Sequence, residues 1–289
     1  MPFSPKTVKF KLMSRIVKWP VALTIAGSDS GGGAGVQADL KAFAALEVHG
    51  ACVITCLTAQ NPRRVLAVEP CSPDIVRRQL EAVFEELPPA AVKTGMLFSS
   101  EIIRAVAAFL KKIKGPPLVV DPVMIATSGA VLLPPAAVKI LMEQLLPRAS
   151  LVTPNLAEAE VLTGRKIASV EDLRAAAREI HARFGCPALV KGGHLRGQRE
   201  AVDILFDGRT EWLLCAPFVK GLSTHGTGCA CSAAVTGALA RGHDLPRAVE
   251  IAKHHVTDAI RRSYRIGTHF ALGHFAGRPR LYGCHNRKN

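Results

Sequence analysis

Apolar runs with strand character alternate along this chain with amphipathic runs of helical period. Strands are expected at residues 21–26, 51–58, 91–94, 118–121, 151–153 and 188–191, followed by a hairpin of 202–206 and 211–215 around Asp207-Gly208. Helices are expected at 36–46, at 73–87, after Ser99 or Ser100, after Asn155 to 162, after Ser169 to 184, at 228–241 and after Asp244. Strands that are apolar throughout and alternate with helices form a mostly parallel sheet covered on both faces. The pattern therefore predicts an α/β fold.

Two of the helix starts carry additional local signals. Ser72 precedes Pro73, which suits the first turn of a helix, and Ser169 precedes Asp172 at the spacing of a capping box. No internal repeat and no Gly/Ser-rich linker interrupts the pattern, so we expect one domain.

Polar clusters follow the strands at the ends where ligands bind in parallel sheets. Seven such clusters gather at one edge of the predicted sheet, which indicates one large polar site. They are residues 27–29, 60–61, 93–95, 121–122, 153–155, 191–194 and 224–229.

The last of these clusters contains a glycine turn that runs directly into a helix. Gly226-Thr227-Gly228 leads to Cys229, and small residues fill the first helical turns. Helix N-termini present unpaired N–H groups and a partial positive charge, so this turn is suited to hold an anion. The same field lowers a thiol's pKa, and we expect Cys229 to be activated in this way.

A second glycine-rich segment, residues 27–35, follows the first strand. It is not a Walker A loop, because no Gly-Lys-[Ser/Thr] closes it. Residues 33–38 do fit the dinucleotide pattern G-x-G-x-x-A, but the second strand ends at Gln60 without an acidic residue to hold a ribose. Hydride transfer, and a turn that only packs a helix on the sheet, remain the alternatives for this segment.

The net charge of +14 is confined to the two ends of the chain. Five basic residues and no acidic ones lie in residues 1–20, and seven basic residues and no acidic ones lie in 259–289. The rest is nearly neutral, so we expect no nucleic-acid function.

The eight cysteines form no C-x2-C pair, which argues against structural zinc. Without a secretory or membrane-spanning apolar segment, we expect a cytoplasmic protein.

An anion site, a lysine, an aspartate and an Asn-x-x-Glu at successive strand ends favour phosphoryl transfer, which depends on positioning and charge stabilisation. Seven motifs lie along the chain at residues 26–41, 58–61, 93–96, 121–124, 153–160, 191–194 and 225–229. Together, and in family order from about Val21 to Tyr264, these motifs resemble those of the hydroxymethylpyrimidine/phosphomethylpyrimidine kinases of thiamin biosynthesis in the ribokinase superfamily. The domain prediction is a basic extension (1–20), a kinase domain (21–264) and a basic tail (265–289).

The resemblance implies a three-layer α/β/α fold, a homodimer and two successive phosphorylations by ATP and Mg²⁺. The substrates would be 4-amino-5-hydroxymethyl-2-methylpyrimidine and then its monophosphate. The pyrimidine would lie against Gly27, Asp39, Gln60, Met96, Val123 and Cys229. Gln60 can supply the donor and acceptor that an aminopyrimidine edge needs.

The other site residues are expected around the phosphates. Asp121 and Glu158 would hold Mg²⁺, the latter through water, with Glu160 as a solvated comparison. Asn155, Lys191 and Thr227 would bind ATP. The N–H groups of residues 226–229 would stabilise the transferring phosphoryl group, with Cys229 as proton acceptor.

One loop departs from the family pattern. Thr127-Ser128-Gly129-Ala130 lacks the lysine and aspartate that usually flank Ser-Gly. This puts the second phosphorylation in question. A pyridoxal or pyridoxine kinase, and a catalytically silent pyrimidine sensor, are the alternative functions.

Overall fold

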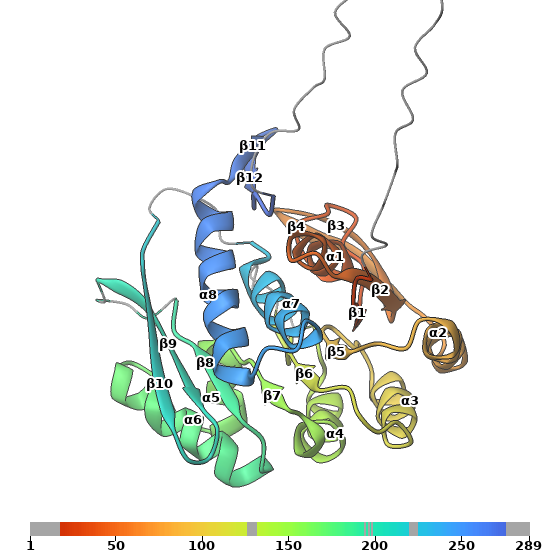
Figure 1. Cartoon of the computed structure of the whole chain (residues 1–289), viewed down its shortest axis with the longest axis horizontal. Helices are drawn as coiled ribbons and strands as arrows, with labels where there is room; N and C mark the ends of the chain where they lie inside the picture. Colours follow the sequence, from red (N-terminus) through yellow and green to blue (C-terminus); the bar gives the residue numbers. More distant parts are fainter. Residues whose placement is uncertain are drawn as a thin grey trace, which may run out of the picture.

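The computed structural model describes residues 18–125, 132–193, 195, 197, 199–219 and 225–275, and their main sheet has eight strands. The strand order is β10-β9-β8-β7-β6-β5-β1-β2 (Figure 1). The strands are β1 (Val21–Ala26), β2 (His49–Ile54), β5 (Ala91–Thr94), β6 (Leu118–Val120), β7 (Leu151–Val152), β8 (Ala188–Lys191), β9 (Glu200–Phe206) and β10 (Glu211–Pro217). The strands from β2 to β8 pair in parallel, whereas β9 and β10 form the predicted antiparallel hairpin at one edge.

Helices cover both faces of this sheet and give the three-layer α/β/α arrangement that was expected (Figure 1). The cluster of buried residues on one face joins the sheet to α2 through α6, and the clusters on the other face join it to α1, α7 and α8. The helices are α1 (Gly35–Ala45), α2 (Pro73–Glu86), α3 (Ser100–Leu110), α4 (Pro135–Gln144), α5 (Leu156–Thr163), α6 (Val170–Phe184), α7 (Thr227–Ala240) and α8 (Leu245–Arg261), with a 3-10 turn at Leu146–Arg148.

The caps that start these helices confirm the local signals in the sequence. The side chains of Ser72, Ser99, Ser169 and Asp244 each accept a backbone N–H of the first helical turn. Ser169 and Asp172 form a reciprocal capping box, which satisfies donors that the helix itself leaves unpaired.

Alternation along the strands decides which side chains meet which layer. Leu23 and Ile25 of β1 pack toward α2–α6, whereas Ala22 packs toward α1 and α7. Thr24 lies on the same side as Ala22, and its register partner on β5 is Lys93. Two buried polar side chains are therefore placed side by side beneath α1.

Small residues let α7 pack closely against its neighbours. Ala230, Ala233, Ala234 and Gly237 are buried or closely packed, and a Cβ on Gly237 would lie 3.1 Å from Leu46 Cδ1. Bulkier side chains here would push α7 away from α1 and move the N-terminus of α7 from the sheet edge.

Three local differences from the predicted elements stand out. The expected strand 51–58 is divided at Thr55: β2 ends at Ile54, and β3 (Cys56–Asn61) leaves the main sheet to pair with β4 (Arg64–Pro70). Thr55 fixes the bend by donating its hydroxyl to Met96 O at 2.6 Å. The prediction also lacked α4, β4 and the hairpin of β11 (Tyr264–Ile266) and β12 (His269–Ala271).

The short β11–β12 hairpin extends beyond residue 264, where the expected kinase domain ends. Leu272, directly after it, packs with Ala230 and Ala259. Within the part of the chain that the structure describes, no helix has the length and apolar character needed to cross a bilayer.

Candidate active site

A cavity of about 290 Å³ lies at the carboxyl ends of the parallel strands. Every site residue expected from the sequence lines it: Gly27, Asp39, Gln60, Met96, Asp121, Val123, Asn155, Glu158, Lys191, Gly226, Thr227, Gly228 and Cys229. The topology brings together residues from eight segments of the chain, because parallel strands end at the same edge.

The glycine-rich segment after β1 folds around its own aspartate. Asp29 is buried, and its carboxylate accepts the backbone N–H groups of Gly31, Gly33 and Ala34 at 2.8–3.0 Å. Burial acts to raise the pKa of Asp29, but His225 and these N–H groups outweigh it and the pKa is lowered. Because the loop's own carboxylate uses these N–H groups, they do not form a phosphate-binding nest.

The second glycine turn touches the first. Gly226 has a φ of +82°, and a Cβ there would collide with the carbonyl oxygen of Gly33. His225 Nε2 lies 3.6 Å from Asp29 Oδ2. Only glycine fits position 226 without displacing the other loop, so the two turns fix the N-terminus of α7 beside that of α1.

A positively charged side chain lies next to the N-terminus of α7. A Cβ on Gly228 would lie 3.4 Å from Lys191 Nζ, so the lysine reaches the turn from the end of β8. Lys191 pairs with Asp121 at 3.2 Å. Burial acts to lower the pKa of Lys191, but the charges of Asp121 and Glu158 and the hydrogen bond to Asp121 act in the opposite direction, and the pKa is raised. The turn and the lysine together form a positively charged pocket for an anion.

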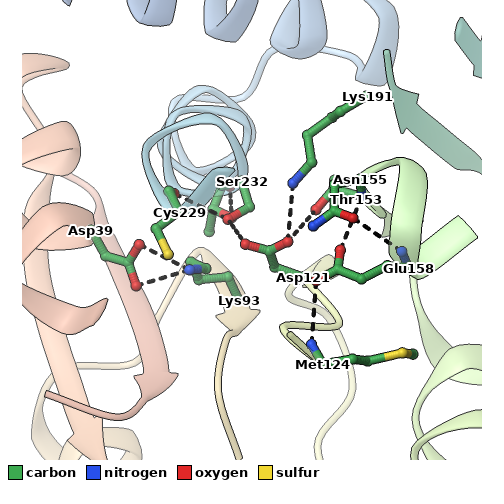
Figure 2. A network of polar contacts seen from close by, with 11 residues as sticks. Asp39, Lys93, Asp121, Met124, Thr153, Asn155, Glu158, Lys191, Cys229 and Ser232 are labelled. Atoms are coloured by element: carbon green, nitrogen blue, oxygen red, sulfur yellow. Dashed lines mark hydrogen bonds and ion pairs between the residues drawn. The ribbon is translucent and has the colours of Figure 1, made fainter. Parts of the chain in front are cut away.

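Asp121 connects four elements of the site (Figure 2). Besides Lys191, its carboxylate accepts the hydroxyls of Ser232 on α7 at 2.9 Å and of Thr153 after β7 at 3.3 Å. These hydrogen bonds and the ion pair compensate for the burial of a carboxylate that is only 3% exposed.

Glu158 is not a solvated helix residue. It is buried, accepts the N–H groups of Asn155 at 2.9 Å and Met124 at 3.3 Å, and forms a capping box with the Asn155 side chain (Figure 2). Glu160, two residues on, instead pairs with Lys166 and accepts the N–H of Ile167. Burial and the charge of Asp121 raise the pKa of Glu158 to about 7.

These donors fit a magnesium ion that keeps most of its water. Asp121 and Glu158 supply carboxylates close to Thr153 and Asn155, and Mg²⁺ is commonly held by one or two carboxylates plus water and phosphate oxygens. Both oxygens of Glu158 already accept backbone N–H groups, which suits contact through water. Among the described residues, no group of three or more His, Cys, Asp or Glu side chains could hold a metal alone.

Asp39, expected against the pyrimidine, is part of a buried ion pair. Lys93 Nζ lies 2.9 and 2.8 Å from its two oxygens, and Thr24 Oγ1 donates to Oδ2 at 2.6 Å. Both side chains of the pair are at most 1% exposed. Burial opposes the charge on Lys93, but the Asp39 carboxylate outweighs it and raises the pKa of Lys93.

The expectation that the helix lowers the pKa of Cys229 is wrong. Burial raises the pKa of this thiol to about 12, and the charges of Asp39 and Asp121 add to the increase. The Lys93 charge acts in the opposite direction but does not compensate. The helix N-terminus is surrounded by carboxylates that the local sequence does not show, and the resting side chain is a thiol.

The other end of the cavity offers a narrow apolar slot. A Cβ on Gly27 would lie 2.6 Å from Cys56 Sγ and 2.8 Å from Met96 Cε, so glycine is needed beneath these two side chains. Val123 has a φ of +42°, which is a strained conformation for a β-branched residue. Gln60, on β3, also lines this end of the cavity.

Several residues that build the site were given no role in advance. Lys93 and Thr153 lie in the predicted polar clusters without an assigned role, whereas Ser232, Asp203 and Lys253 lie outside those clusters. All five hold buried polar contacts, and Asp203 pairs with Lys253 at 2.7 Å at the α8 end of the cavity. A lysine inside an apolar strand is a sequence signal for a buried polar contact at Lys93. Its partner, Asp39, is 54 residues away in the sequence. Thr127, Ala130 and His194 lie outside the described residues, as does Thr224.

A ribokinase-like α/β fold with an anion site, a lysine and two buried carboxylates at one sheet edge defines the class as a small-molecule kinase. Residues 29–274 match the family model described as phosphomethylpyrimidine kinase. The chain belongs to this family.

Individual relatives agree with this assignment. A hydroxymethylpyrimidine/phosphomethylpyrimidine kinase of Rhizobium meliloti is 53% identical over 85% of this chain and 92% of its own length. The phosphomethylpyrimidine kinase structure from Clostridium difficile has a TM-score of 0.75 at 46% identity, covering 83% of this chain and 99% of that one. An ADP complex of Bacillus subtilis pyridoxal kinase has a TM-score of 0.82 at 38% identity, covering 89% and 98%.

The raised pKa of Glu158 predicts a specific pH dependence of stability. Between its ordinary pKa of 4.5 and about 7, Glu158 holds a proton in the folded protein that it lacks in the unfolded chain. The contribution of Glu158 therefore lowers the free energy of unfolding as pH rises through this window. Urea unfolding with EDTA should show that Glu158→Gln reduces this fall. Glu160→Gln, the matched control, should keep the wild-type slope, and equal slopes in both variants would contradict the prediction.

Proposed function

We propose that this protein transfers the γ-phosphoryl group of ATP to 4-amino-5-hydroxymethyl-2-methylpyrimidine, and then to its monophosphate, in thiamin biosynthesis. One observation carries the proposal. In a single cavity, the glycine turn and Lys191 adjoin the carboxylates Asp121 and Glu158, and a slot lined by Gln60, Met96 and Val123 lies at the other end.

The residues at the Gln60 end of the cavity fit a flat ring with a polar edge. Met96 and Val123 would contact the two faces of the ring, and the Gln60 amide would pair with its aminopyrimidine edge. Asp39 retains one free lone pair on Oδ1 beyond its bonds to Lys93 and Thr24. A direct contact between Asp39 and the pyrimidine stays a prediction.

The nucleotide would occupy the α8 end of the cavity. Pro217, Phe218, Val256 and Ile260 provide apolar surface there for a base. Lys191, Asn155 and Thr227 line the same cavity and would bind the phosphates.

The reaction requires mostly positioning and charge stabilisation. The hydroxymethyl oxygen would attack the γ-phosphorus in line, while the N–H groups of residues 226–229 and the Lys191 ammonium stabilise the negative charge on the phosphoryl oxygens. Asp121 and, through water, Glu158 would hold Mg²⁺, which neutralises charge on the β- and γ-phosphates when bound. Cys229, after losing its own proton to water, would accept the proton of the hydroxymethyl group as a thiolate.

A product assay tests the proposed reaction and its rival. The purified protein is incubated with ATP, Mg²⁺ and either hydroxymethylpyrimidine or pyridoxal, and products are identified by mass spectrometry. We expect mono- and then diphosphate from the pyrimidine. Phosphorylation of pyridoxal alone would assign the vitamin B6 branch, to which the pyridoxal kinase similarity points. No product from either would favour a pyrimidine-binding sensor. A monophosphate that is not converted further would implicate the loop with Thr127 and Ala130.

Cys229 can be tested separately from binding. Cys229→Ala should reduce kcat by about 10²–10⁴-fold, the range typical of a proton-transfer group. The Kd for hydroxymethylpyrimidine, measured by calorimetry, should change little because ring recognition lies at Gln60, Met96 and Val123. Cys215→Ala, on exposed β10, is the control. Unchanged turnover in Cys229→Ala would remove the thiol from the mechanism.

We also infer a cytoplasmic homodimer. The β3–β4 hairpin exposes Leu57 and Leu66, and Arg63 in its turn donates hydrogen bonds to His269 and Thr268 of the β11–β12 hairpin. The two hairpins lie at the same end of the molecule (Figure 1), and exposed apolar side chains gathered this way are typical of an interface.

Sedimentation analysis tests the dimer. Leu66→Lys should shift the protein toward monomer, because burying an unpaired charge in an interface is unfavourable. Leu87→Lys, at an exposed leucine that follows α2, should leave the association state unchanged. A wild-type monomer, or a dimer that survives Leu66→Lys, would contradict an interface at this hairpin.

A further inference from the structure

Lys93 is a buried cation that the proposed chemistry does not use. It lies at the end of β5, lines the cavity and is among the largest fully buried side chains among the described residues. A Cβ on Gly95 would lie 3.5 Å from its Nζ, so the ammonium group lies beside the backbone of this glycine. A purely structural ion pair has no need to line a ligand cavity.

Its partners fix the ammonium beside Cys229. Asp39 holds Nζ through both carboxylate oxygens, and Thr24 in turn donates to Asp39. Figure 2 shows the Cys229 sulfur directed toward the Lys93 ammonium and the Asp39 carboxylate. The three elements α1, β5 and α7 thus place one positive and one negative charge at the thiol.

The surroundings of this sulfur oppose a negative charge, and they would oppose it more strongly without Lys93. Asp39 and Asp121 both oppose negative charge on Cys229, and Lys93 is the cation that favours it most. Lys191, the other cation near the α7 N-terminus, is engaged by Asp121. A proton acceptor at position 229 therefore needs a charge that its own helix does not supply.

We propose that Lys93, held by Asp39 and Thr24, is a positioning residue that supplies the positive charge needed by Cys229 to take the substrate proton. The inference rests on the proposed function.

As the substrate oxygen bonds to the γ-phosphorus, the bond from phosphorus to the β–γ bridging oxygen breaks and its electron pair leaves with ADP. Cys229 first loses its thiol proton to water, and the hydroxyl proton of the substrate then passes to the thiolate and restores the resting thiol. Lys93 increases the fraction of protein that holds the thiolate. Asp39 acts by keeping Lys93 charged and in place.

A double variant separates this role from a structural one. Lys93→Met/Asp39→Leu replaces the ion pair by apolar side chains of similar size, and such replacements of buried pairs are often neutral or stabilising. Urea unfolding first verifies that the variant is folded. Two readouts follow: kcat and KM for the pyrimidine, and the rate at which iodoacetamide alkylates Cys229 in the ligand-free protein, measured peptide by peptide. Cys186 and Cys215 serve as internal controls.

The Lys93 charge acts on the Cys229 pKa more strongly than the opposing Asp39 charge, so the loss of both should leave a smaller fraction of thiolate. We expect kcat to fall by about tenfold and Cys229 alkylation at fixed pH to slow by a similar factor, which corresponds to about one pKa unit. The rise of kcat with pH should shift to higher pH. Lys93→Arg, which keeps the charge, should retain more turnover and faster alkylation than the double variant. Alkylation of Cys186 and Cys215 should not change.

The two readouts make failure of the proposal distinguishable from failure of the proposed function. A folded double variant with wild-type kcat and wild-type Cys229 alkylation would overturn the role of Lys93. Slowing of alkylation at all three cysteines would also overturn it, since that indicates a general change in packing. If the wild-type protein phosphorylates neither ring but Cys229 alkylation still slows selectively, the charge assignment stands and the proposed reaction is wrong.

Discussion

The Asp121 carboxylate is the interaction on which the arrangement of the site depends. It accepts bonds from Lys191 at the end of β8, Thr153 after β7 and Ser232 on α7, and it follows β6 itself. Removing one partner of a buried ion pair costs on the order of 3–5 kcal/mol, because the other charge is left uncompensated. The lysine that serves the anion pocket and the helix that forms it are therefore held by the same group that is proposed to hold the metal.

The two glycine turns impose a second constraint, which is steric. Gly226 lies against the Gly33 carbonyl, and the small residues of α7 allow that helix to approach α1. The turns have different tasks although both precede helices. In the first, Asp29 uses the loop's N–H groups, so the anion pocket is left to the second turn, where Lys191 adds a positive charge.

Charges across the cavity explain why the pKa shifts of the Glu158 carboxyl and the Cys229 thiol cannot be predicted from the local sequence. Burial and the charge of Asp121 raise the pKa of Glu158 toward neutral pH. Burial and the charges of Asp39 and Asp121 raise the pKa of Cys229. A cavity with this many buried carboxylates favours cations. This property suits a site that holds a metal cation beside an anionic nucleotide, because the positive charge of the metal would offset the carboxylates.

The sequence alone determined the α/β class, most element positions, the helix caps and the edge of the sheet at which the site lies. These depend on hydrophobic period, on capping chemistry within three residues and on the rule that parallel strands end at one edge, all of which are local or topological. Tertiary structure alone decided the division of the strand at Thr55, the ion pair of Lys93 with Asp39 and the direction of the Cys229 pKa shift. Each of these depends on groups that are distant in sequence and meet only when the layers pack, and the strength of a charge depends on how much water that packing removes.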